Sequence, residues 1–451
     1  MRILSKIALT LSTAALLAGP WLFGAWEAWW FWPLATLLFV AIALFGVTLL
    51  DAESIVAGFS ERLLRRDVAP LLVAIGVFLA YAIVRMFMAR VYADAERSLL
   101  LFVLPLFVAG IAAYSAGPAG RRVLVYLLAF NILCLGLYGL VNHWLTGSER
   151  VMWMPGYLQY YADNRASGSY FCPNHFAGIL ELGAALALGL MADRGVKWGG
   201  RLFALLLLAV CVAGVILSKS RGGGVTLLAL LLLAPFTGLV QWRPRARWLV
   251  RAGVALLSLA AAGLVAWQAV EYRGRFAAFP WDDIEKSDRV QMVKGALRAW
   301  QTAPVLGIGP GMHQSLWSHF AASPDGDREK GIWPTRLNTG WHSYEVHNDW
   351  VQLLEEYGAL GLALFLAVLG LLLRGLWRGL RREEEEWQAA QWAAPGQPRF
   401  TGIIAAGLLA AAAMILHEAV DFNLQMPATG WVLGAILGLA VAESTRAQAA
   451  Q

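Results

Sequence analysis

Charged side chains are scarce in this chain of 451 residues. Asp, Glu, Lys and Arg together make up 15% of the sequence, whereas hydrophobic residues make up 59%. A soluble globular domain carries about 25% charged and roughly 45–50% apolar residues. Because the apolar residues come in blocks long enough to cross a bilayer, the composition excludes an ordinary soluble domain and predicts a membrane protein.

Cysteine is also rare. The three cysteines, Cys134, Cys172 and Cys211, are scattered without metal-binding spacing, and two of them fall in apolar blocks. We therefore expect no disulfide framework. No metal-ligand cluster is evident elsewhere in the sequence, and we expect no metal and no cofactor. The net charge of +6 does not indicate a nucleic-acid partner, because the basic residues cluster between apolar blocks, where they set the orientation in the membrane.

The apolar blocks predict an all-α polytopic bundle of about 12 transmembrane helices. Residues 1–25 also fit a signal peptide, with Arg2 and Lys6 before an apolar run. We expect an uncleaved first helix instead, because a second long apolar block follows directly and no clean small-residue cleavage site precedes it. The predicted helices lie near residues 7–25, 29–50, 69–89, 98–115, 121–142, 173–192, 201–218, 222–240, 248–269, 351–373, 401–419 and 429–444.

Lys and Arg are unevenly distributed between the two ends of these helices. With the N-terminus in the cytoplasm, the cytoplasmic segments hold 20 basic residues and the short outer loops hold five. Since basic loops stay in the cytoplasm, we expect both termini there and residues 143–172 and 270–346 outside. We predict one integrated membrane domain, with helices one to nine in residues 1–269, a large periplasmic loop at 270–346 and helices ten to twelve in 347–451.

The large outer loop contains a helical pattern. Apolar residues recur there at near-helical spacing, and the pair Ser287–Asp288 suits a helix start. The recurring residues are Val290, Val293, Leu297 and Trp300.

A short polar segment from Ser218 to Gly224 interrupts two apolar blocks on the outer side. It holds Lys219, Arg221 and three consecutive glycines. An arginine at a helix start, beside backbone that a ligand can approach closely, is suited to binding phosphate. The alternative is a tight helical hairpin with an arginine that reaches the interface.

Asp288 and Arg289 begin the predicted loop helix, so Arg289 could supply a second guanidinium group. The alternative is an exposed arginine paired with Asp288. The glycines between Pro304 and Gly311 predict a turn rather than a dinucleotide-binding site, because no strand precedes them.

His347 lies at the start of the tenth predicted helix. Asn348, Gln352 and Glu355 form a polar stripe beside it. A histidine at the mouth of a membrane cavity can act as a base near neutral pH. The alternative is an interfacial histidine without a chemical role.

Further polar residues occur at the ends of other predicted helices. Ionisable groups at this depth usually face a bundle interior or a water-filled cavity. They are either part of the site or paired within the core, and the sequence leaves both possibilities open. The residues are Asn174, His175 and Glu181 in the sixth helix and His417, Glu418, Asp421 and Asn423 at the outer end of the eleventh.

These motifs together resemble the O-antigen ligase/polymerase superfamily. The stretch His347 to Leu362 is similar to the histidine motif of that family, and Ser220-Arg221-Gly222 is similar to its arginine motif. Asp288 to Trp300 with Pro304 to Gly311 resembles its loop pattern. The segments 170–178 and 417–424 are similar to segments of one bacterial branch. The glycine run after Arg221 departs from the family, where many members have a bulkier residue.

The resemblance implies a bacterial inner-membrane glycosyltransferase that acts without a metal. Its donor would be an undecaprenyl-diphosphate-linked glycan, and its acceptor a lipid A–core or another glycan. Arg221 and Arg289 would hold the diphosphate, and His347 would activate the acceptor hydroxyl. We also expect Asn348, Glu355, Asn174, His175 and Asp421 to bind substrate.

Other functions remain open at this stage. Ligases and polymerases share these motifs, and an exopolysaccharide polymerase fits the same residues. A protein O-oligosaccharyltransferase would use a protein acceptor instead. A polysaccharide transporter fits the helix number, although no paired halves with matching broken helices are evident. The leading prediction requires Arg221, Arg289 and His347 to converge at one outer pocket.

Overall fold

The computed structural model describes residues 2–50, 68–154, 156–157, 164–237, 288–320, 343–390 and 401–445. Every regular element in these ranges is helical, and no strand occurs in them. Eight of the helices are long and apolar enough to cross a membrane, and three shorter apolar helices accompany them. The all-α membrane bundle is therefore confirmed, whereas the count of twelve spans is not.

The α-helices follow the chain in order, with short 3₁₀ segments at Phe23–Ala25, Ala234–Thr237 and Asn423–Gln425. They are α1 (Arg2–Ala18), α2 (Ala28–Leu49), α5 (Ala69–Phe87), α6 (Tyr92–Ser115), α7 (Pro118–Thr146), α8 (Pro173–Ala192), α9 (Trp198–Ser218), α10 (Arg221–Leu233), α13 (Asp288–Thr302), α14 (Met312–Phe320), α16 (Asp349–Ala390), α17 (Gly402–His417) and α18 (Pro427–Ser444).

Several predicted boundaries differ from the observed ones. The first helix ends at Ala18 rather than at residue 25, because Gly19 and Pro20 follow it, and Phe23, Gly24 and Ala25 then adopt positive φ angles that no α-helix accommodates. The tenth predicted helix continues to Ala390, well beyond 373, because the charged residues after the apolar block are also good helix formers. The predicted span 248–269 lies outside the described residues.

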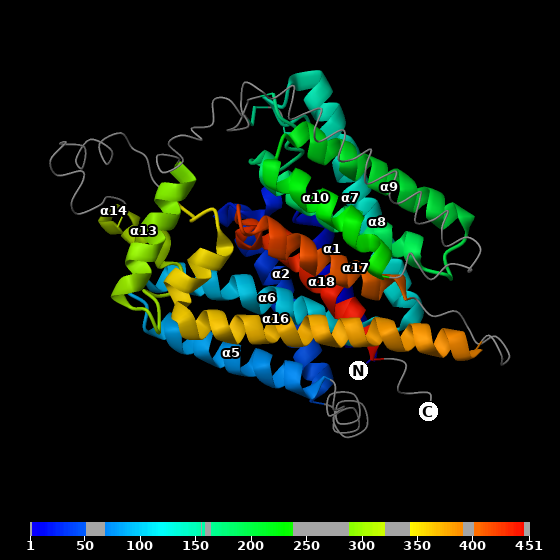
Figure 1. Cartoon of the computed structure of the whole chain (residues 1–451), viewed down its shortest axis with the longest axis horizontal. Coiled ribbons are helices and arrows are strands. Elements are labelled where there is room, and N and C mark those ends of the chain that lie inside the picture. Colours follow the sequence, from blue (N-terminus) through cyan, green and yellow to red (C-terminus); the bar gives the residue numbers. More distant parts are fainter. Residues whose placement is uncertain are drawn as a thin grey trace.

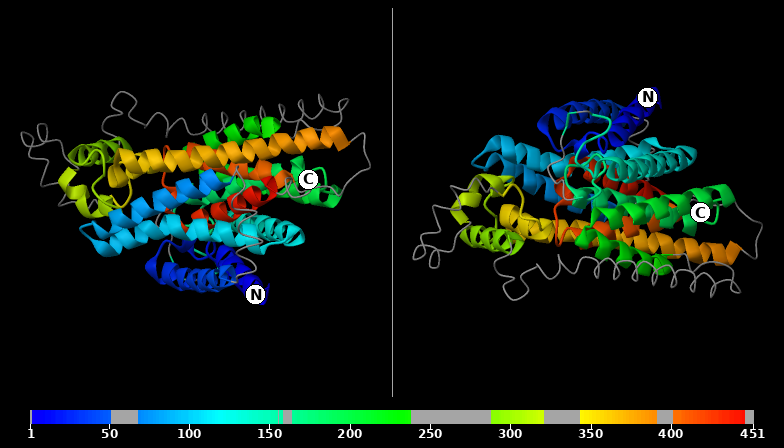
Figure 2. Two further views of the ribbon diagram at one scale, coloured as in Figure 1. Left: turned by 90° about the horizontal axis from the view of Figure 1, so that it is seen from below. Right: turned by 90° about the horizontal axis from the view of Figure 1, so that it is seen from above.

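The core of the bundle forms around α8. Nearly every residue of this helix is buried, and α9 and α17 pack on it. Its many Ala and Gly residues allow this close approach, as is usual for helices within membranes. Figure 2 shows the α1–α2 hairpin on one side of the bundle and α16 on the opposite side.

The helices of the outer loop lie at one end of the bundle. The predicted helix start at Asp288 is confirmed, since α13 begins there. Both α13 and α14 pack against the start of α16 (Figure 1). We call this the loop end of the bundle. The contact between Asp193 and Gly402, where α8 ends and α17 begins, marks the opposite end.

A kink in α16 receives the turn that the glycine-rich segment forms. Gly358 has φ 70° and ψ −178°, and these angles break the helix near the loop end. Ala359 N–H donates to the Pro304 carbonyl at 2.9 Å, and Ile308 N–H donates to the Glu355 carbonyl at 2.9 Å. The segment that follows α13 is therefore attached directly to the backbone of α16.

Candidate functional site

Asp421, in the connection between α17 and α18, is the centre of a polar cluster at the loop end. Its side chain is 1% exposed. Asn174 donates to Oδ2 at 2.6 Å, and Arg289 forms an ion pair with the same oxygen at 3.2 Å. Nδ1 of His347 lies 3.4 Å from Oδ1, and Nε2 of His175 lies 3.7 Å from it. One carboxylate thus joins four side chains.

Three separate segments supply the four side chains that meet Asp421. Asn174 and His175 come from the first turn of α8, Arg289 from the first turn of α13, and His347 from the residues just before α16. Phe422 lies between the two imidazoles and meets each edge-on, with ring centroids 4.4 Å from His175 and 4.6 Å from His347. These contacts fix the directions of both imidazole rings.

Asp421 is ionised in this environment. Burial by itself would raise the pKa of the carboxyl group. Hydrogen bonds with His175 and His347 and the positive charge of Arg289 outweigh burial and hold the pKa of Asp421 well below its ordinary value. A carboxylate accepts hydrogen bonds only, so the imidazole nitrogens that face it carry hydrogen.

His347 is therefore oriented as a base. Nδ1 faces the carboxylate, so the neutral ring with hydrogen on Nδ1 keeps its lone pair on Nε2, and the side chain is 27% exposed. The backbone of His347 has φ 57°, a left-handed conformation that costs about 1–3 kcal/mol for a residue with a side chain. Such strain persists only where surrounding contacts enforce it.

Asn348 helps to hold the backbone of His347 in this conformation. Its Nδ2 donates to the Ala419 carbonyl at 2.8 Å, and its Oδ1 accepts from Val351 N–H at 3.0 Å at the start of α16. Asp349 N–H donates to the Glu418 carbonyl at 2.9 Å. The start of α16 is thus tied to the segment that carries Asp421.

Arg221 is exposed at the first position of α10, where Ser220 caps the helix by accepting from Gly223 N–H at 3.1 Å. Gly222 lies against the segment before Asp421, since a Cβ there would be 2.8 Å from Val420 Cγ2. The starts of α10 and α16 therefore both contact residues 417–421. Arg221 and His347 lie at the same end of the bundle.

Arg165 is a further guanidinium group, which was not predicted from the sequence. Its Nη2 donates to Asn174 Oδ1 at 2.7 Å and its Nε donates to the Ser218 carbonyl at 2.8 Å. It therefore links the first turn of α8 to the segment before Arg221. Its position in a long outer loop was the only sequence feature that could have indicated it.

Glu355 lies in a second, separate cluster. Its Oε2 pairs with His313 Nδ1 at 2.8 Å, and His313 Nε2 lies 3.0 Å from the Ser343 hydroxyl. Gln352 donates to Glu345, which lies two residues before His347. Burial raises the pKa of Glu345 to about 7. No described contact joins Glu355 to Asp421.

Metal ligands are not grouped in the part of the chain that the structure describes. Across those ranges, no set of three or more His, Cys, Asp or Glu side chains is arranged to hold a metal ion.

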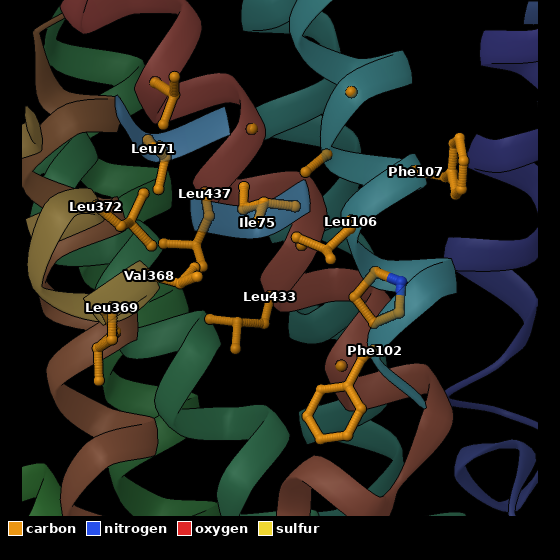
Figure 3. Close-up of a pocket in the computed structure, with 18 of the residues that line it drawn as sticks. Leu71, Ile75, Phe102, Leu106, Phe107, Val368, Leu369, Leu372, Leu433 and Leu437 are labelled. Atoms are coloured by element: carbon orange, nitrogen blue, oxygen red, sulfur yellow. The ribbon is translucent and has the colours of Figure 1, made fainter. Parts of the chain in front are cut away.

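A cavity of about 920 Å³ lies between α5, α6, α16 and α18. Figure 3 shows leucine, isoleucine, valine and phenylalanine side chains from these four helices around it. Its polar lining includes Asp349, Gln352 and Glu356 at the loop end and Arg121 toward the opposite end. Because Asp349 follows His347 by two residues, the cavity reaches the neighbourhood of the Asp421 cluster.

The fold and site together define a polytopic helical membrane protein with a carboxylate, two imidazoles and a guanidinium group clustered at one end of its bundle. Residues 203–366 match the protein-family model described as O-Antigen ligase. The match includes Arg221, Arg289 and His347, and it confirms the resemblance to the O-antigen ligase/polymerase superfamily. A search of curated proteins gives no match.

Proposed function

We propose that the protein transfers a glycan from undecaprenyl diphosphate to an acceptor hydroxyl, in the manner of an O-antigen ligase. The observation that carries the proposal is the pairing of His347 and Arg289 with one ionised carboxylate, Asp421. A base and an anion-binding group then face the same substrate. The O-antigen ligase family match over residues 203–366 supports the same reaction.

The reaction needs only these groups. The acceptor oxygen attacks the anomeric carbon, the bond from that carbon to the diphosphate oxygen breaks, and the diphosphate leaves with the electron pair. His347 Nε2 takes the proton of the acceptor hydroxyl. Arg221 and Arg289 stabilise the negative charge on the departing diphosphate, which arginine can do through paired hydrogen bonds. The Arg289 side chain is 41% exposed and is accessible to such an anion.

Burial divides the remaining predicted site residues by role. Asp421 and His175 have side chains 1% and 5% exposed, so we assign them to orienting His347 and the surrounding segment rather than to touching substrate. Asn174 links Asp421 to Arg165, and Asn348 holds the start of α16. Glu355, paired with buried His313, maintains the packing of α14 on α16.

The apolar cavity provides a place for the polyisoprenoid chain of the donor. It runs within the bundle toward the Asp421 cluster, and a chain in it would leave its diphosphate at the loop end. The basic residues in the described connections at the opposite end support a cytoplasmic location there and a periplasmic location for the site; they are Arg121, Arg122, Arg194, Lys197 and Arg201. We accordingly assign the protein to the bacterial inner membrane.

A deletion strain tests the proposal. We expect long polymer to accumulate on the lipid carrier, unattached to lipid A–core, because chain growth continues without transfer. Accumulation of single lipid-linked repeats would instead identify a polymerase, and loss of glycan from a protein would identify a protein glycosyltransferase. Normal surface glycan in the deletion strain would contradict the proposal. Full complementation by a His347→Ala protein would favour transport over transfer.

A further inference from the structure

A second ionisable pair lies deeper in the bundle than the Asp421 cluster. Glu181 of α8 and His417, the last residue of α17, have side chains that are 0% exposed, and Oε1 lies 2.8 Å from Nδ1. Apolar residues of similar volume are often as stabilising as a buried pair. Ionisable groups within membrane helices are costly, and they usually serve a function.

Neither residue of this pair can touch a substrate, because neither is exposed. Any influence on the reaction must pass through groups that the pair contacts. The imidazole also packs on a segment that precedes the candidate site. Its Nε2 has no hydrogen-bond partner among the described residues and faces the first turn of α10.

The first turn of α10 packs directly on this ring. A Cβ at Gly222 would lie 2.9 Å from Cδ2 and 3.0 Å from Nε2 of His417. A Cβ at the following residue, Gly223, would lie 2.8 Å from the Cβ of Ala177, one turn before Glu181 on α8. The consecutive glycines thus allow the start of α10 to touch both helices that hold the pair.

We propose that Glu181 and His417 position Arg221. Glu181 fixes the imidazole, the imidazole supports Gly222, and Arg221 is the residue directly before Gly222. His417 also begins the segment that ends in Asp421, whose carboxylate binds Arg289. The pair therefore sets the distance between the two guanidinium groups that bind the diphosphate, and this inference rests on the proposed function.

The inference assigns a physical reason to the glycine run after Arg221, in which many family members carry a bulkier residue. A side chain at position 222 would push α10 away from His417 and Val420. In this protein the imidazole fills the volume that such a side chain would occupy. His417 and Gly222 therefore form one packing unit.

Binding of undecaprenyl diphosphate to the purified full-length protein tests the proposal. Arg221→Ala should weaken binding by about 10-fold or more, because it removes a charge-assisted hydrogen bond to the diphosphate. His417→Gln should weaken it about fivefold or more. The double variant of Arg221→Ala and His417→Gln should bind no more than about twofold worse than Arg221→Ala alone. Once Arg221 is absent, His417 has no arginine to position.

Variants of Glu181 separate its charge from its hydrogen-bonding role. Glu181→Gln keeps a polar group of the same size beside Nδ1, which lies 2.8 Å from Oε1, and should stay within about threefold of the wild type, whereas Glu181→Leu should match His417→Gln. Gly222→Ala should weaken binding as much as His417→Gln does, and it should add no further loss of affinity to Arg221→Ala. This variant tests the proposal even if His417→Gln does not fold.

Asp193→Asn is the matched control. Asp193 is buried and joins the same two helices at the opposite end, where it accepts from Gly402 N–H at 2.9 Å. It should lower thermal stability and leave binding within about twofold, a change of less than about 0.5 kcal/mol.

Two results overturn the inference while the proposed function stands. One is wild-type affinity in His417→Gln, Glu181→Leu and Gly222→Ala together with weak binding by Arg221→Ala. The other is a double variant whose loss of affinity equals the product of the two single losses, because the two sites would then act independently. Binding that is insensitive to Arg221→Ala would instead contradict the proposed function, and the inference with it.

Discussion

Asp421 is the residue on which the proposed chemistry depends most. Its carboxylate contacts the candidate base and one of the two candidate anion-binding groups. From the sequence, Asp421 was predicted to bind substrate, with pairing in the core as the alternative. Its burial favours a positioning role, a distinction that requires knowing which side chains surround it.

Asp421→Asn should reduce the rate of glycan transfer about 100-fold or more, with the protein still folded. The Asn amide can donate a hydrogen bond to Nδ1 of His347, whereas the carboxylate can only accept one. The ring would then carry its hydrogen on Nε2, and Nε2 could no longer act as the base. Single-turnover transfer and thermal unfolding of the purified variant would be measured together. Activity within threefold of the wild type would remove Asp421 from the mechanism.

Glu345 should make stability depend on pH near neutrality. Burial raises its folded pKa to about 7, above the unfolded value of roughly 4.3, while Arg97 and His313 act in the opposite direction. The folded state therefore binds the extra proton between these values. This contribution to stability is complete below the unfolded pKa and is lost as the pH rises through about 7.

Thermal unfolding at a series of pH values checks this expectation. The unfolding temperature of the wild type should fall as the pH rises from about 4.5 to about 7 and level off above that, as expected for a difference of about one bound proton, and Glu345→Gln should lack that component. Equal falls in both proteins would show that other groups are responsible.

At the scale of the elements, the kink in α16 joins the outer loop to the membrane bundle. The angles φ 70° and ψ −178° at Gly358 belong to a region that is essentially restricted to glycine. A Cβ at this position would lie 2.2 Å from the Val305 carbonyl oxygen. The close backbone approach and the conformation both require glycine.

Gly358→Ala should destabilise the protein by more than about 1 kcal/mol and release the segment 304–309 from α16. Hydrogen exchange of Ile308 and Ala359 N–H groups should then increase. Gly370→Ala in the same helix is the control, because a Cβ there meets nothing within 4 Å. It should be neutral or stabilising by up to about 1 kcal/mol. Equal behaviour of the two variants would contradict the role of the kink.

The periodicity of apolar residues predicted most of the helices, because span length and amphipathic pattern are local properties. The start of α13 at Asp288 was predicted from local residues in the same way. The docking of Pro304–Gly311 on Gly358 was not predicted, because it joins segments distant in sequence. Glu355 was grouped with Asn348 by helical spacing, but its partner, His313, comes from another element.

At the scale of the whole molecule, the cavity and the Asp421 cluster meet at the loop end. Leu433 on α18 faces the cavity with Val368 and Leu372 on α16 (Figure 3). A chain of isoprene units is suited to this lining, since burial of apolar surface contributes about 25 cal/mol per Å². The donor would then be bound at two places, its chain in the cavity and its diphosphate at the arginines.

Leu433→Trp should raise the KM for a long-chain undecaprenyl-diphosphate donor about 10-fold, because the indole occupies cavity volume. A donor with a ten-carbon chain should be affected less than threefold. Leu366→Trp is the control, since Leu366 is exposed on α16 and does not line the cavity. Equal effects on both donors would place the chain elsewhere.

Transfer by purified protein tests the central claim most directly. The wild type would be incubated with an undecaprenyl-diphosphate glycan and lipid A–core, with and without a chelator, beside His347→Ala, Arg221→Ala and Arg289→Ala. We expect glycosylated lipid A–core from the wild type under both conditions, and a loss of about 100-fold or more from His347→Ala with its insertion in the membrane intact. Full activity in His347→Ala would contradict the account.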